Sequence, residues 1–189
     1  YELKGGSIKI DGVDTRDMKR EDLRSLFGMV LQDTWLFNGT IEENIKYGNF
    51  NASKEDVILA AKIANVHHFI KTLPEGYDMV LNEEASNISQ GEKQLLTIAR
   101  AILSDPAILI LDEATSSVDT RLELMLQQAM QNVMKGRTSF VIAHRLSTIK
   151  SADLILVIKD GNIIEQGNHK ELIAKGGFYE ELYNSQFAE

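Results

Sequence analysis

The chain has 189 residues, 43% hydrophobic and 25% charged, a globular composition that excludes wholesale disorder. Its formal net charge is −8 and it contains no block of lysine or arginine, which argues against nucleic-acid binding as its main role. The absence of cysteine excludes disulfides and cysteine-based zinc sites. The longest apolar runs, 107–111 and 154–158, are far shorter than the roughly 20 residues of a membrane-spanning helix.

The first part of the chain predicts a strand, a helix and a second strand. Residues 7–11 alternate between polar and apolar side chains and turn at Gly12, which is typical of a strand. A short helix is expected over 20–26. An apolar strand follows over 27–31 and stops at the polar residue Gln32.

A mainly helical stretch is expected from about residue 33 to residue 105. Ser53 begins an amphipathic helix whose apolar residues recur at helical spacing. Shorter helical pieces are expected over 39–48 and 66–73, and a longer one from Ser89 to about residue 103. His67 and His68 carry no metal-ligand pattern and are expected to be solvated.

The last part predicts an apolar strand over 107–111, a helix over about 119–134 and a second apolar strand over 139–143. Strands that are apolar throughout are typical of parallel sheets covered on both faces, and the strand–helix–strand succession has the length of a βαβ crossover. A hairpin of 154–158 with 162–166 and two short helices are expected to follow. The fold class is therefore α/β, with a helical insert at about 33–105.

Polar residues follow three of the apolar strands. They are Gln32, the pair Asp112 and Glu113, and His144. Ligands of open α/β sheets bind at the carboxyl ends of strands, where one carboxylate can hold Mg²⁺ and the next can orient a water molecule. Each of these residues alone equally suits a turn cap or a core position. Their joint occurrence favours phosphate chemistry.

Residues 87–94 carry a second signal. Ser89 and Glu92 have the spacing of a capping box, and Gly91 between them leaves room for close approach to the backbone. A helix N-terminus of this kind can bind an anion, although the same pattern also suits an ordinary helix start.

Together these residues resemble the nucleotide-binding domain of ABC transporters of the exporter type. The motifs occur in the order of that family, and the resemblance covers essentially the whole chain. In chain order they are residues 30–32 (Q-loop), 82–84 (X-loop), 88–92 (signature sequence), 108–113 (Walker B), 116–119 (D-loop) and 142–144 (H-loop).

The resemblance implies a P-loop nucleoside triphosphatase-like sheet core with a helical subdomain. Residues 1–32 would form part of the ATP-binding core, and residues 33–105 would form the helical signature subdomain. Residues 106–189 would form the rest of the ATP-binding core and the C-terminal helices. It also implies ATP and Mg²⁺ as cofactors, with Asp112 and Gln32 at the metal. Glu113 would polarise the attacking water, and His144 would contact the γ-phosphate.

The resemblance also implies two kinds of partner. A second nucleotide-binding domain would hold an ATP molecule against the signature residues Ser89, Gln90, Gly91 and Glu92. Asp119 of the D-loop would lie at the same interface. Transmembrane domains would contact the regions of Gln32 and Glu83, which places the chain at the cytoplasmic face of a membrane. Trp35 and Phe37 suit either that contact or core packing.

The chain departs from the family pattern in two ways. Gln90 and Glu92 stand where many members have glycine and glutamine, and the extra carboxylate is expected to weaken engagement of the partner's ATP. No Gly-x-x-x-x-Gly-Lys-Ser/Thr loop occurs. The chain is therefore expected to start after that loop, as part of an export ATPase. A fragment that only folds and associates, and a soluble non-transport ABC ATPase, are the alternatives.

Overall fold

The computed structural model describes residues 3–82, 85–112, 120–143 and 146–187. The chain divides into two compact units, residues Tyr1–Val141 and Ile142–Glu189. Within the described ranges, no helix has both the length and the apolar character needed to cross a membrane.

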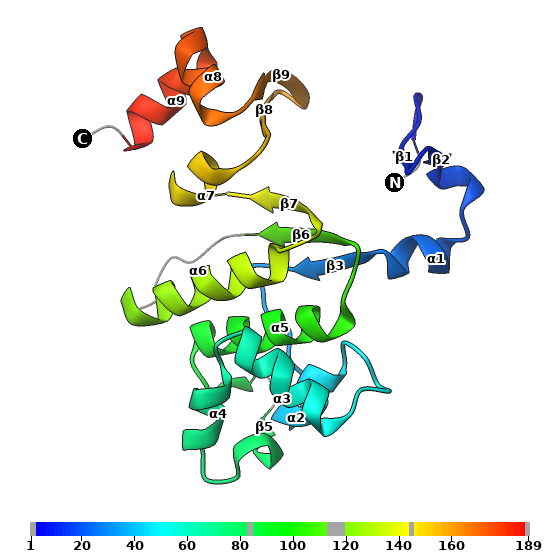
Figure 1. The fold of residues 1–189 in the computed structure, drawn as a ribbon, viewed down its shortest axis with the longest axis vertical. Coiled ribbons are helices and arrows are strands. Elements are labelled where there is room, and N and C mark those ends of the chain that lie inside the picture. Colours follow the sequence, from blue (N-terminus) through cyan, green and yellow to red (C-terminus); the bar gives the residue numbers. More distant parts are fainter. Residues whose placement is uncertain (1–2, 83–84, 113–119, 144–145, 188–189) are drawn as a thin grey trace. The chain divides into compact units, whose positions relative to one another are not determined.

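The first unit contains most of the helices and strands (Figure 1). Up to the end of the helical stretch its elements are β1 (Lys9–Ile10), β2 (Val13–Asp14), η1 (Thr15–Asp17), α1 (Arg20–Ser25), β3 (Phe27–Val30), β4 (Gly39–Thr40), α2 (Ile41–Lys46), α3 (Lys54–Ile63), α4 (His67–Thr72), η2 (Gly76–Asp78), β5 (Val80–Leu81) and α5 (Gln90–Ser104). They are followed by β6 (Ile108–Asp112), α6 (Thr120–Met134) and β7 (Thr138–Ile142), of which β7 ends at the boundary between the units.

The expected sheet core is confirmed. β3 pairs with β6 in parallel, with Phe27 opposite Ile108 and Val30 opposite Leu111. The strand order is β3-β6-β7, and the three arrows point the same way in Figure 1. The carboxyl ends of the strands therefore meet at one edge.

Only one face of this sheet is covered within the described residues. The side chains of Val30, Leu109 and Leu111 are fully buried in the main core, to which α5 and α6 also contribute. Met29 of β3 and Phe140 of β7 are 53% and 55% exposed.

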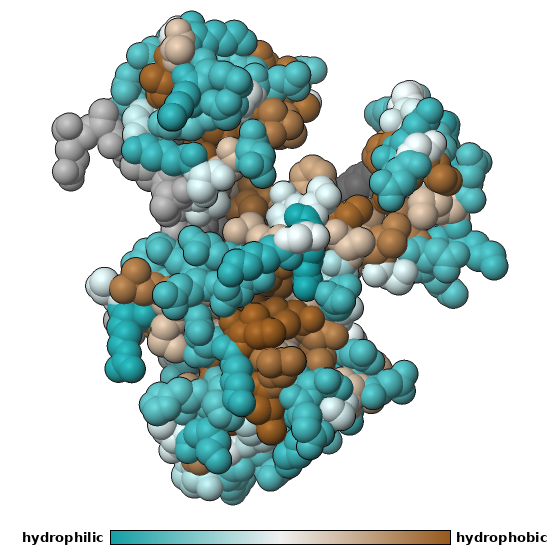
Figure 2. Space-filling view, viewed as in Figure 1, coloured by the Kyte–Doolittle hydropathy of each residue, from teal (hydrophilic) through white to brown (hydrophobic). Residues whose placement is uncertain are grey.

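The helix starts follow the capping chemistry expected from the sequence. Four helices begin with a reciprocal pair, in which the cap side chain accepts from the backbone N–H of the third helical residue and that residue's carboxylate accepts from the cap N–H. The pairs are Thr40 with Glu43, Ser53 with Asp56, Ser89 with Glu92, and Asn168 with Glu171. Figure 2 shows hydrophobic side chains over α3 and α5, on a surface that is otherwise largely hydrophilic.

The N-terminal strand is shorter than expected. Residues 7–11 do not form one strand, because the chain turns back at Asp11 and Gly12 and pairs β1 with β2. Both turn residues have positive φ, 48° and 84°, as a tight two-residue hairpin turn requires. The sequence does not predict the β4–β5 pair or helix α7, because strands of two residues and a helix of six residues are too short to show a hydrophobic period.

His67 differs from the expectation of a solvated side chain. It is half-buried, and its Nδ1 lies 2.8 Å from the hydroxyl oxygen of Tyr77. Burial lowers the pKa of His67, and burial also raises the pKa of Tyr77 to about 12. His68, by contrast, is exposed as expected.

The second unit is built on the predicted hairpin. Its elements are α7 (Leu146–Ser151), β8 (Ile155–Lys159), β9 (Asn162–Gly167), α8 (His169–Lys175) and α9 (Phe178–Phe187). β8 and β9 pair antiparallel around Asp160 and Gly161, both at positive φ. A small separate core of Val157, Leu172 and Tyr179 holds the unit together.

Candidate functional site

The edge of the sheet brings two predicted site residues together. Val30, the last residue of β3, lies opposite Leu111 in a parallel pair. Asp112 is the next residue of β6 and ends that strand, and Gln32 follows two residues after Val30. Asp112 is half-buried and Gln32 is exposed. A carboxylate and an amide thus lie at the edge where open α/β sheets bind ligands.

The other predicted groups of this edge are Glu113 and His144, which lie outside the described residues, as do Asp119 and Glu83. Their roles stay predictions. Among the residues that the structure does describe, no group of three or more His, Asp or Glu side chains is arranged to hold a metal ion. Asp112 and Gln32 alone are too few ligands for a site built only from protein.

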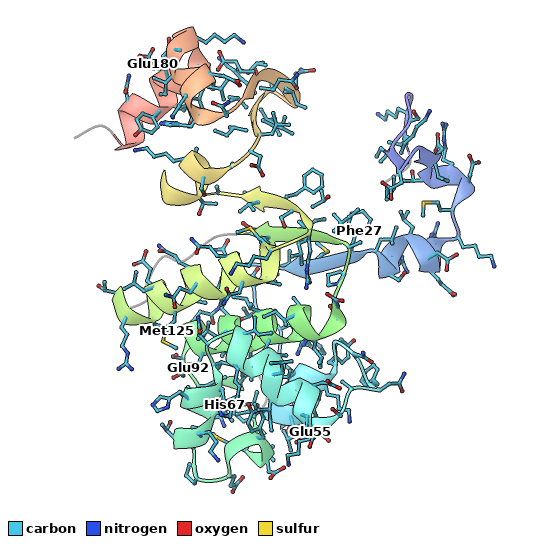
Figure 3. The ribbon with its side chains drawn as sticks, in the orientation of Figure 1. Phe27, Glu55, His67, Glu92, Met125 and Glu180 are labelled. Carbon is cyan, nitrogen blue, oxygen red and sulfur yellow. The ribbon has the colours of Figure 1, made fainter. Side chains whose placement is uncertain are left out.

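The start of α5 forms the second candidate group (Figure 3, where Glu92 is labelled). A carboxylate oxygen of Glu92 accepts from the Ser89 backbone N–H at 2.8 Å, and the Ser89 hydroxyl accepts from the Glu92 N–H at 3.4 Å. Gly91 is buried, while Ser89 and Gln90 are exposed. The predicted capping box is confirmed, and it presents a hydroxyl and the positive end of a 15-residue helix to the surface.

These two groups are joined by the segment that follows Gln32. The Gln90 side chain donates from Nε2 to the Thr34 hydroxyl at 3.1 Å. Further along α5, Arg100 donates from Nη1 to the Trp35 carbonyl at 3.1 Å. The segment after β3 is therefore attached to the signature helix at two places.

An aromatic surface lies on this segment and on the end of α2. It consists of Trp35, Phe37, Tyr47 and Phe50, whose neighbouring ring centroids are 5.5–6.0 Å apart. Trp35, Tyr47 and Phe50 are 60%, 47% and 71% exposed. Phe37 and Phe50 line a surface pocket together with Glu43 and Lys46. Exposed aromatic side chains gathered in one patch are typical of a contact surface.

Sequence reasoning considered Trp35 and Phe37 but missed Tyr47, Phe50 and the residues that support them. The available signal was Arg100, a charged residue within the otherwise apolar run 98–103 of a helix. An arginine in such a position needs buried partners, which points to an internal polar network.

Comparisons with known proteins identify the family of the chain. The sequence pattern that defines the ABC transporter family matches residues 1–116, which is more than half of the chain. The chain belongs to the ABC transporter family. Its described fold agrees with the ABC ATPase fold expected from the sequence.

The chain is similar to three relatives at 50–56% sequence identity. The chain is 56% identical over 187 residues to the "Uncharacterized ABC transporter ATP-binding protein YfiC" of Bacillus subtilis (strain 168), with 99% of this chain and 31% of that protein covered. It is 56% identical over 182 residues to a fatty acid ABC transporter ATP-binding/permease protein of Mycobacterium bovis, covering 96% and 29%. It is 50% identical over 189 residues to an ATP-dependent lipid A-core flippase of Syntrophus aciditrophicus, covering 100% and 31%.

A solved structure shows the same fold. A bacterial Atm1-family ABC exporter, determined with ATP bound, superposes with a TM-score of 0.91 and 44% identity, covering 100% of this chain and 33% of that chain. The chain thus spans about a third of the length of the relatives that it matches.

Proposed function

We propose that this chain is part of the ATP-binding and ATP-hydrolysing motor domain of an ABC exporter. The observation that carries the proposal is the parallel pairing of β3 and β6, since Gln32 follows β3 and Asp112 ends β6 at the carboxyl edge of the sheet in a member of this family. The names of the relatives, which include ATP-binding/permease proteins and an ATP-dependent flippase, support the assignment to export.

At the sheet edge we assign each group by its chemistry. The oxygens of Asp112 and Gln32 suit Mg²⁺, which is usually bound by one or two carboxylates together with phosphates and water. When bound, Mg²⁺ offsets the negative charge of the phosphate groups. Glu113 is proposed to orient and deprotonate the attacking water, and His144 to donate a hydrogen bond to the γ-phosphate.

At the start of α5, Ser89, Gln90 and Gly91 are proposed to receive the γ-phosphate of an ATP molecule held by a second nucleotide-binding domain. The exposed hydroxyl of Ser89 and the helix N-terminus are suitable donors for an anion. Asp119 is proposed to lie at the same interface. The two domains would then complete each other's sites.

The transmembrane domains are proposed to contact the regions of Gln32 and Glu83, and the aromatic surface extends that contact area. Its exposed rings suit an apolar partner segment, which would place the chain at the cytoplasmic face of a membrane. Residues 33–105 would form the helical signature subdomain between residues 1–32 and 106–189 of the ATP-binding core.

A second candidate function applies to the 189 residues taken alone, namely folding and association without ATP binding. The exposed side chains of Met29 and Phe140 on the open face of the sheet favour it, because parallel sheets are ordinarily covered on both faces. The absence of a Gly-x-x-x-x-Gly-Lys-Ser/Thr loop in the sequence favours it as well.

Calorimetric titration with Mg-ATP separates these candidates. We expect the 189-residue chain to bind weakly or not at all, and the complete protein that contains it to bind ATP and hydrolyse it. Micromolar binding by the chain alone would reject the second candidate. Failure of the complete protein to hydrolyse ATP would reject the first.

A further inference from the structure

Arg100 lies within the signature helix and holds the backbone of the segment that bears the aromatic surface. Its Nε donates to the carbonyl oxygen of Asn44 at 2.9 Å, and its Nη2 donates to the side-chain oxygen of Asn44 at 3.2 Å. Its Nη1 reaches the Trp35 carbonyl at 3.1 Å. One planar guanidinium thus connects three acceptors from two segments, which lysine cannot reproduce.

Asn44 is the second part of this network. It is only 1% exposed, and its side-chain oxygen also accepts from the Phe37 N–H at 3.0 Å. Its Nδ2 donates to the carbonyl oxygens of Phe37 and Thr40, each at 3.0 Å. Buried networks in which each polar group has a partner hold one conformation strongly.

The same guanidinium supports the aromatic rings. Its central carbon lies 5.1 Å from the ring centroid of Tyr47 and 5.9 Å from that of Trp35. Cation–π contacts of this kind contribute about 0.5–2 kcal/mol each. Burial lowers the pKa of Arg100, but the ordinary pKa of a guanidinium lies so far above neutrality that the side chain stays charged.

The helix that carries Arg100 begins at the exposed cap Ser89. Ten residues separate Gln90, which bonds Thr34, from Arg100, which bonds Trp35 and Asn44, a helical distance of about 15 Å. A rigid helix held at both places cannot move without the segment to which it is bonded. The segment that bears Trp35 is thus bonded both near the start of α5 and at Arg100, a geometry through which a displacement of the aromatic surface can act on the start of the helix.

We propose that Arg100 and Asn44 form a positioning joint that couples the aromatic surface to the signature residue Ser89. The joint rests on the proposed function, since it makes Arg100 the residue through which contact by the membrane domains changes the signature end of α5. Arg100 serves as a positioning residue, whose hydrogen bonds go to Asn44 and to the Trp35 backbone. It acts through the backbone that it holds.

A purely structural role would have a different consequence. If Arg100 served only to stabilise the fold, its removal would lower every activity in proportion to the folded protein. If it is a joint, its removal separates two activities: the basal ATPase rate remains, while stimulation by the transported substrate is lost. Coupling energies between sites are typically worth about 5- to 150-fold.

The first arm of the test uses the 189-residue chain, in which Trp35 is the single tryptophan. Arg100→Met keeps the apolar stem and removes the cation, and it should change the fluorescence emission of Trp35 at unchanged helix content. Arg24→Met, at an exposed position on α1, is the matched control and should leave the emission as it is. Unchanged Trp35 emission in a folded Arg100→Met chain would overturn the joint.

The second arm uses the complete transporter in lipid vesicles. Arg100→Met should keep its basal ATPase rate within about twofold while substrate stimulation falls by at least about fivefold. Arg100→Lys, which keeps the charge and is the variant to measure if Arg100→Met does not fold, should show an intermediate loss. A proportional fall of both rates would overturn the joint. A wild-type transporter without any ATPase activity would instead reject the proposed function, leaving the first arm as the test of the joint.

Discussion

The side-chain amide of Gln90 donates a hydrogen bond to the hydroxyl of Thr34 at 3.1 Å, across 56 residues of sequence. This bond ties the signature residues to the segment after Gln32. Gln90→Ala and Thr34→Val should each lower the free energy of unfolding, with a coupling of about 0.5–1 kcal/mol in the double-mutant cycle. Urea unfolding of the four chains measures it, and fully additive losses would contradict the bond.

Glu92 places a carboxylate beside the residues proposed to receive a phosphate. Glu92→Gln should retain the helix start, because an amide oxygen can still accept from the Ser89 N–H, which Glu92 now holds at 2.8 Å. Removal of the negative charge should raise the ATPase rate of the complete transporter. Glu171→Gln makes the same change in the capping box of α8 and should have no effect. An unchanged or lower rate in Glu92→Gln would count against the proposed role.

Gly48, two residues after the end of α2, lies close to the backbone of α5. A methyl group at this position would collide with the carbonyl oxygen of Arg100 and lie 3.2 Å from the backbone nitrogen of Ser104. Gly48→Ala should therefore destabilise the chain by about 1–3 kcal/mol through overpacking. Gly5→Ala, which meets nothing within 4 Å, is the control. Equal stability of both variants in urea would show that α2 and α5 do not pack as described.

His67 should make stability depend on pH. Burial lowers its pKa in the folded chain, whereas the unfolded chain keeps the ordinary value of 6.5. The unfolded chain therefore binds the proton more readily, so the contribution of neutral His67 is complete above pH 6.5 and is lost as the pH falls toward the lowered value.

His67→Gln should remove this part of the pH dependence, and His68→Gln, at the exposed neighbouring position, should leave it in place. The midpoint of thermal unfolding, measured from about pH 7.5 to about pH 5 at constant ionic strength, tests both variants. Equal slopes for wild type and His67→Gln would contradict the assignment to His67.

The fold could be predicted from the sequence where the local signals were strong. Continuous apolar runs gave the strands around Val30 and Leu111, and the Ser89 capping box gave the start of α5. Arg100 within an apolar run indicates that a polar network exists, but its partners Asn44 and Trp35 could not be predicted, because 56 residues separate Arg100 from Asn44 and no local pattern records a contact of that kind. The exposed fraction of an individual strand residue could not be predicted from the strand alone, because burial depends on the segments that cover a strand as well as on its own residues.

The ATPase rate of the complete transporter carrying Glu113→Gln tests the central claim most directly. The amide keeps the size of the side chain but cannot accept a proton from the attacking water. We predict a fall in kcat of about 10²-fold or more, with Mg-ATP binding retained. An ATPase rate equal to that of the wild type would contradict the assignment of this chain as the motor of an ABC exporter.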